Sequence, residues 1–177
     1  MAEEKKKRPH RRAYLNDFKR NVAGEYVYTG KHFRWRQEPK PVLLRMWLQG
    51  GIAALAALAN GCIPNTGMDR YVWTLLPWVI SFISALSVVY AVGRLSFGGE
   101  RVRAYVLEGS VGKIPMRTGI CSIAAAVSAV GGIVNLFLPN FAGNILCAVI
   151  FVLLQGVTGG LCVLLRRTVA RLEWAEE

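Results

Sequence analysis

Residues 71–93 read YVWTLLPWVISFISALSVVYAVG, a run of 23 residues without a single Asp, Glu, Lys or Arg. An α-helix rises about 1.5 Å per residue, so about 20 apolar residues span the ~30 Å hydrocarbon core of a bilayer. A helix with one side in water would carry charges within such a run. The stretch therefore predicts a transmembrane helix.

Three further stretches share this length and this lack of charge: Met46–Ile63, Gly119–Leu138 and Asn144–Leu165. We therefore predict an all-α membrane protein built as a bundle of four transmembrane helices. The predicted divisions of the chain are a basic and aromatic tail (1–42), a first transmembrane hairpin (43–94, helices 43–63 and 71–93), a connecting loop (95–117), a second hairpin (118–166, helices 118–138 and 144–165) and a C-terminal tail (167–177).

The charges indicate how such a protein would be oriented. Hydrophobic residues make up 53% of the chain, yet its formal net charge is +11. Of the 22 Lys and Arg residues, only Arg70 lies in a segment that links two helices of one hairpin. Because Lys and Arg accumulate on the cytoplasmic side of membrane proteins, we expect a multi-pass cell-membrane protein with both termini in the cytoplasm. The short outer loops favour a bacterial inner membrane.

Two six-residue motifs, NGCIPN at 60–65 and NLFLPN at 135–140, repeat the same pattern 75 residues apart. Proline cannot continue a helix and asparagine readily adopts turn conformations, so each motif predicts the end of a helix. The repeat indicates either a duplicated helical hairpin with a pseudo-two-fold axis along the membrane normal, or two helix ends that share common terminating residues. The residues that the motif singles out are Asn60, Pro64, Asn65, Asn135, Pro139 and Asn140.

Small and polar residues recur inside the predicted helices. Ala124, Ser128 and Gly132 are spaced four apart, and Gly156 and Gly160 form a GxxxG pattern. In lipid, small residues let helices approach closely, so both sets are candidates for packing within the chain or against a partner chain. The amides of Gln49, Gln155, Asn60 and Asn135 are candidates for hydrogen bonds between helices or for a polar pathway.

The N-terminal tail carries two further patterns. Tyr14, Leu15, Phe18 and Val22 recur at helical spacing among basic residues, which predicts an amphipathic helix against anionic lipid head groups at the cytoplasmic face or against the connecting loop. Aromatic residues alternate on either side of Thr29-Gly30-Lys31, which predicts a β-hairpin.

The connecting loop contains GGERVRAYVLEGSVGK, which lacks the order of a phosphate-binding loop. Its segment Glu100–Glu108 predicts two turns of interfacial helix.

The inventory of reactive residues argues against an enzyme. The only histidines, His10 and His32, have no metal-ligating partner at a useful spacing, and the four cysteines form no CxxC pair. The four uncharged stretches contain no Asp or Glu, whereas proton- or cation-coupled transporters commonly keep an ionisable group inside the bilayer. We therefore expect no catalytic residue, no metal and no cofactor. Nucleic acid is not expected either, because the cytoplasmic placement of basic residues already explains the charge.

The function that the sequence favours is a non-catalytic accessory or scaffolding component of a membrane complex, of unknown biochemical activity. The alternative is a small transporter or channel, which would be oligomeric if one copy cannot enclose a path. The expected partners are the lipid bilayer and either another membrane protein or a second copy of the chain.

Overall fold

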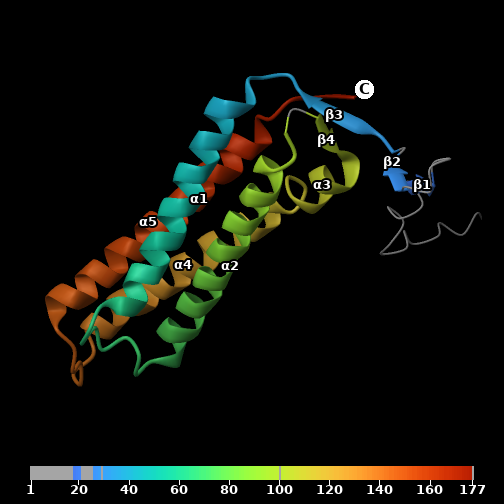
Figure 1. Cartoon of the computed structure of the whole chain (residues 1–177). Helices are drawn as coiled ribbons and strands as arrows, with labels where there is room; N and C mark the ends of the chain where they lie inside the picture. The colour runs from blue at the N-terminus through green and yellow to red at the C-terminus, as the bar shows by residue number, and fades with distance from the viewer. Residues whose placement is uncertain (1–17, 21–25, 29, 100, 177) are drawn as a thin grey trace, which may run out of the picture.

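Four long helices dominate the protein, whose structure is a computed structural model that describes residues 18–20, 26–28, 30–99 and 101–176 (Figure 1). All four are long and apolar enough to cross a membrane. This confirms that the chain is mostly helical and carries four helices of that kind. They are α1 (Pro39–Cys62), α2 (Val72–Ser96), α4 (Ile114–Leu136) and α5 (Ile145–Ala170).

The helices extend beyond the uncharged runs at the end where the chain is basic. α1 begins at Pro39 and includes Arg45, and α5 continues through Arg166 to Ala170. Proline is favoured in the first turn of a helix, where its missing N–H would have no partner within the helix. At its other end α5 is capped by Asn144, whose side chain accepts hydrogen bonds from Leu146 N at 2.9 Å and Cys147 N at 3.4 Å.

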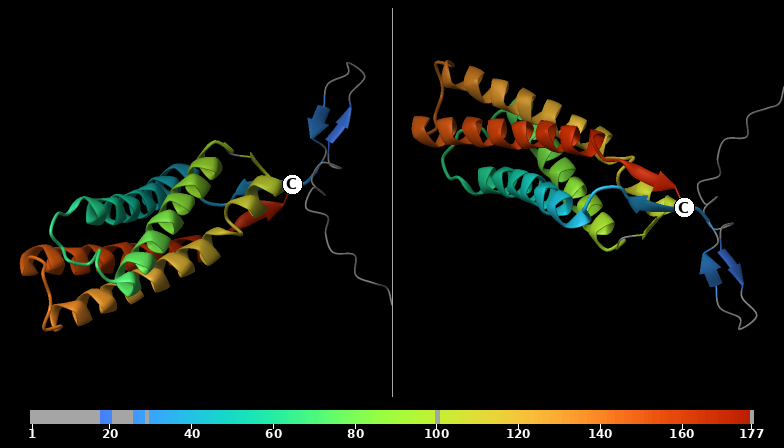
Figure 2. Two further views of the ribbon diagram at one scale, coloured as in Figure 1. Left: turned by 90° about the horizontal axis from the view of Figure 1, so that it is seen from below. Right: turned by 90° about the horizontal axis from the view of Figure 1, so that it is seen from above.

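The helices follow one another around a closed order. α1 packs against α2 and α5, and α4 packs against the same two helices. Neighbouring helices run in opposite directions, so the two short connections, 63–71 and 137–144, lie at one end (Figures 1 and 2). We call this the turn end. The opposite end, where α1 begins and α5 finishes, carries a small sheet and is called the sheet end.

Three segments that are far apart in sequence form this sheet. β3 (His32–Trp35) lies between β4 (Arg101–Arg103) and β5 (Trp174–Glu176), and both pairings are antiparallel. The rings of Trp35 and Trp174 lie 4.3 Å apart, and Val102 is fully buried. Lys31 forms an ion pair with Glu176, and this contact raises the pKa of Lys31 above its usual value.

The pairing of the strands corrects two predictions for the tail. β2 (Tyr26–Tyr28) pairs with β1 (Phe18–Arg20) instead of β3, so the predicted hairpin around Thr29-Gly30-Lys31 is wrong. The predicted amphipathic helix is wrong where it is described, because Phe18 belongs to β1. Tyr14, Leu15 and Val22 lie outside the described residues.

The connecting loop also differs from its prediction. Residues 101–103 form β4, and only Ala104–Gly109 form a helix, α3. Glu100 lies outside the described residues. Val102 instead pairs with Phe33 of β3. This pairing between residues far apart in sequence prevails over the helical spacing of the loop.

The core changes in character along the helices. Near the sheet end it contains large side chains, including Met46, Leu95 and Leu165. In the middle it consists of alanines and cysteines, which allow the helices to approach closely. All four cysteines are free thiols. The outward faces carry large apolar side chains instead of charges, among them Leu55, Ile83, Ile123 and Leu153, each at least 60% exposed.

The two small-residue patterns have different surroundings. Ala124, Ser128 and Gly132 are buried, and a Cβ added at Gly132 would lie 2.9 Å from Val152 Cγ2. Gly156 and Gly160 are exposed, and an added Cβ there would meet nothing within 4 Å. Gly156 and Gly160 therefore do not pack against another helix of the described chain, and of the two alternatives for this pattern only packing against a partner chain stays a prediction.

Candidate functional site

The repeated motifs lie together at the turn end. α1 ends at Cys62 and α4 at Leu136, shortly before the two prolines. The backbone nitrogen of Asn144 donates to Asn65 O at 2.7 Å, which joins the two connections, and Asn65 has a positive φ of 55°. Asparagine tolerates this conformation better than most residues. The four residues that end the motifs are all exposed: Pro64, Asn65, Pro139 and Asn140.

Asn135 is the centre of a buried hydrogen-bond network. Its Oδ1 accepts from Trp73 Nε1 at 3.0 Å, and its Nδ2 donates to Thr74 Oγ1 at 2.9 Å. A third contact joins Nδ2 to Met68 Sδ at 3.4 Å. The side chain is fully buried, and these bonds connect α4 to the start of α2 and to the connection before it. Asn135 therefore has the surroundings of a structural residue.

Asn60 is also buried, with 3% of its surface exposed, but neither Oδ1 nor Nδ2 has a hydrogen-bond partner among the described residues. The 75-residue shift of the repeat pattern shows a matching difference in sequence. It maps Trp73 and Thr74, which hold Asn135, onto Ala148 and Val149, which have no polar side-chain atom. Each of these two polar groups left unsatisfied costs about 1–3 kcal/mol.

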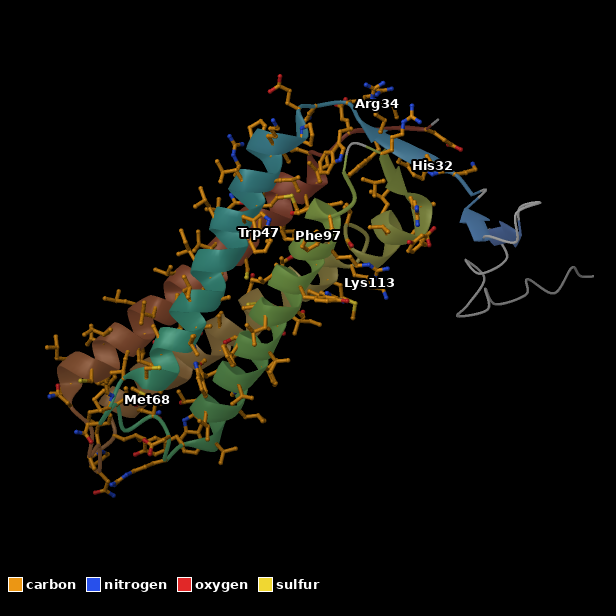
Figure 3. The ribbon with its side chains drawn as sticks, viewed as in Figure 1. His32, Arg34, Trp47, Met68, Phe97 and Lys113 are labelled. Carbon is orange, nitrogen blue, oxygen red and sulfur yellow. The ribbon has the colours of Figure 1, made fainter. Side chains whose placement is uncertain are left out.

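A cavity of about 350 Å³ adjoins Asn60 at the turn end. Its lining includes the charged Asp69 and Arg70 at the exposed connection, and the aromatic rings of Trp78 and Phe151 deeper in. Met68, which touches Asn135, also lines it and is labelled at this end in Figure 3. The cavity is therefore lined by residues of the first motif, approaches the second motif through Met68, and combines apolar walls with a few polar groups, as ligand sites do.

Gln155 is a second buried amide without a hydrogen-bond partner in the part of the chain that is described. Nearby, Thr158 Oγ1 donates to Ala53 O at 3.4 Å, which fixes the register of α5 against α1. Since the two helices are antiparallel, Gln155 lies about one turn, and Asn60 about two turns, closer to the turn end than this contact. The two amides thus follow one another along the α1–α5 interface.

The sheet end of the same interface is hollow and basic. A groove of about 480 Å³ lies between the start of α1 and the end of α5, and we call it the α1–α5 groove. Gln49 lies here, and its Oε1 accepts from Thr168 Oγ1 at 3.1 Å. The lining residues are Gln37, Val42, Arg45, Gln49, Leu164, Arg167, Thr168, Arg171 and Leu172.

The arginines of this groove were not among the predicted site residues. The only sequence signal for the groove was residue spacing. Arg45 lies four residues before Gln49, and Arg167 lies four residues before Arg171, so each pair shares one face of a helix. That the two faces meet depends on the packing of α1 against α5, which the sequence does not specify.

The groups that line these two sites can form hydrogen bonds and ion pairs. Across residues 30–99 and 101–176, no group of three or more His, Cys, Asp or Glu side chains is placed to hold a metal ion. The turn-end cavity is lined by the amides of Asn60 and Asn65 and by two opposite charges, and the α1–α5 groove is lined by three cations. Comparison of the chain with protein-family models, with curated proteins and with solved structures finds no match.

Proposed function

We propose that this chain is an integral membrane protein whose four long helices cross the bilayer, and that it serves as a non-catalytic accessory or scaffolding component of a membrane complex. The apolar outward faces of the helices support insertion, because contiguous apolar surface of this extent is unfavourable in water. The basic residues of the sheet end support a cytoplasmic position for that end and for both termini.

The sheet β4-β3-β5 is the observation that carries the scaffolding role. β3 precedes α1, β4 follows α2, and β5 follows α5, so the sheet links both hairpins at one end. A transporter that alternates between two states requires parts of its helix assembly to move against each other. A sheet that ties the ends of three helices together favours a static component, and it forms a folded surface for a cytoplasmic partner.

Replacing one aromatic residue at each end tests this role. Trp174→Ala removes the ring that packs against Trp35, so the sheet should loosen and capture of a partner should fall. Phe137→Ala is the control, because Phe137 is an 84% exposed aromatic residue at the turn end. The measurement is affinity purification in mild detergent, with quantitative mass spectrometry of the proteins that come with the chain.

The expected result is a stoichiometric partner that the Phe137→Ala chain retains and the Trp174→Ala chain loses by about ten-fold, while both chains stay helical by circular dichroism. A chain that purifies without any partner under these conditions would contradict the accessory role.

The alternative of a small transporter or channel is supported by one observation. The buried amides of Asn60 and Gln155 lie along the α1–α5 interface between the turn-end cavity and the α1–α5 groove. Polar groups in this arrangement are suited to a solute path. Solute flux into proteoliposomes that Gln155→Leu abolishes, without loss of folding, would favour this alternative over the scaffold.

A further inference from the structure

We propose that the α1–α5 groove binds the phosphate group of an anionic phospholipid. This inference rests on the proposed insertion of the chain into a membrane, and it adds a specific ligand site to that proposal. The groove is about 480 Å³, within the range of about 300–1,000 Å³ for sites that hold small ligands.

Three cations converge in the groove without an anion to balance them. Arg167 comes from the last turn of α5, Arg171 caps the same helix, and Arg45 comes from α1. No carboxylate lines the groove, and none of the three arginines forms an ion pair within the described part of the chain. The carboxylate of Glu173, the acidic residue closest to Arg171 in sequence, instead lies 3.7 Å from Arg36.

Helix ends alone do not account for this arrangement. The negative end of the α5 dipole favours cations in its last turn, which explains Arg167 and Arg171. Arg45 belongs to α1, whose positive, amino-terminal end lies at the same place, so the dipole of its own helix provides no such stabilisation. A bound anion would stabilise all three side chains together.

The groove offers the hydrogen-bond donors that a phosphate requires. Guanidinium groups bind phosphate oxygens through paired N–H donors, which gives charge-assisted hydrogen bonds with defined geometry. Gln49 Oε1 lies 3.1 Å from Thr168 Oγ1, whose single proton is shared with Leu164 O, and the amide of Gln49 adds its Nε2 donor to the lining of the groove. The polar lining therefore consists mainly of donors, as suits an anion that accepts several hydrogen bonds.

Apolar lining residues favour a phospholipid over a soluble anion. Leu164 is 47% exposed, lies one turn from Thr168 toward the middle of α5, and belongs to the face that would contact lipid. Val42 and Leu172 add apolar surface around the arginines. A phospholipid places its phosphate at the level of the basic residues and its glycerol and acyl chains beside such a leucine.

Lipid retention by the purified full-length chain tests the inference. The chain is solubilised from vesicles of equal parts phosphatidylglycerol and phosphatidylcholine, and the lipid that stays bound is counted by native mass spectrometry. We expect one retained phosphatidylglycerol per chain, and at least about ten-fold less in the variant Arg45→Gln/Arg167→Gln/Arg171→Gln. Inorganic phosphate at millimolar concentration should not displace the lipid.

The matched control variant is Lys40→Gln/Lys113→Gln/Arg166→Gln, which removes three cations at the sheet end that do not line the groove. It should retain the lipid like the unchanged chain. Equal retention by the groove variant and the unchanged chain would overturn the inference, as would equal losses in the two variants, which would indicate diffuse attraction. Full displacement by inorganic phosphate would also overturn it, in favour of a soluble anion.

Two further measurements keep the result interpretable. Arg45→Gln alone should reduce retention by several-fold, so the test survives if the triple variant does not fold. Carbonate extraction of membranes reports insertion separately. A chain that is inserted but retains no phosphatidylglycerol would contradict this inference alone, whereas a chain released by carbonate would contradict the proposed function.

Discussion

At the scale of single residues, Asn60 and Asn135 show that the same motif can have different surroundings. Both side chains are buried, but only Asn135 has hydrogen-bond partners among the described residues. A buried amide with its bonds made contributes to stability, whereas one without them costs free energy. The two residues therefore respond differently to the same substitution.

We expect Asn135→Leu to lower the free energy of unfolding by about 2–4 kcal/mol, because it leaves Trp73 Nε1 and Thr74 Oγ1 without their partner. Asn60→Leu is the matched control and should leave stability unchanged or raise it by about 1 kcal/mol. The measurement is unfolding in mixed detergent micelles of increasing denaturing fraction, followed by tryptophan fluorescence. Equal losses in both variants would show that Asn60 is also held by the protein.

At the scale of elements, the helices were predictable and the strands mostly were not. A local property predicts each helix, namely a run of about 20 residues without charge. β3 instead pairs with residues about 70 and 140 positions away, through strands of only three residues. The alternation around Thr29-Gly30-Lys31 indicated strands correctly, but a local pattern cannot specify a distant partner.

The candidate sites also contain a part that the sequence predicts and a part that it does not. The motif itself identified Asn60 and Asn135, whereas the lack of a hydrogen-bond partner for Asn60 among the described residues depends on how the helices pack, which the motif does not specify. The sequence did not predict the α1–α5 groove, because Arg45 is far in sequence from Arg167 and Arg171 and only helix packing brings them together.

The packing of α4 against α5 gives a prediction with an internal control. Gly132→Ala should lower the free energy of unfolding by about 1–3 kcal/mol, because the new methyl group would lie 2.9 Å from Val152 Cγ2. Gly156→Ala, on the open face of α5, should be neutral or stabilising by up to about 1 kcal/mol. The same micelle unfolding experiment measures both. A loss at Gly156 as large as at Gly132 would mean that another chain covers that face.

At the scale of the whole molecule, charge and apolar surface are arranged along one axis. The sheet end carries the basic groove and the sheet, and among the described residues the turn end carries two short connections. Between them, the outward faces are apolar. This arrangement supports the orientation that we propose, in which both termini are cytoplasmic and the turn end faces the opposite side.

Protease protection of tagged chains in intact cells tests that orientation most directly. Epitope tags are placed at the N-terminus, at the C-terminus and after Asn140, which is exposed at the turn end. We predict that protease added outside the intact membrane removes only the tag after Asn140, and that the terminal tags become sensitive after permeabilisation. Removal of a terminal tag from intact cells, or protection of the tag after Asn140, would contradict the account.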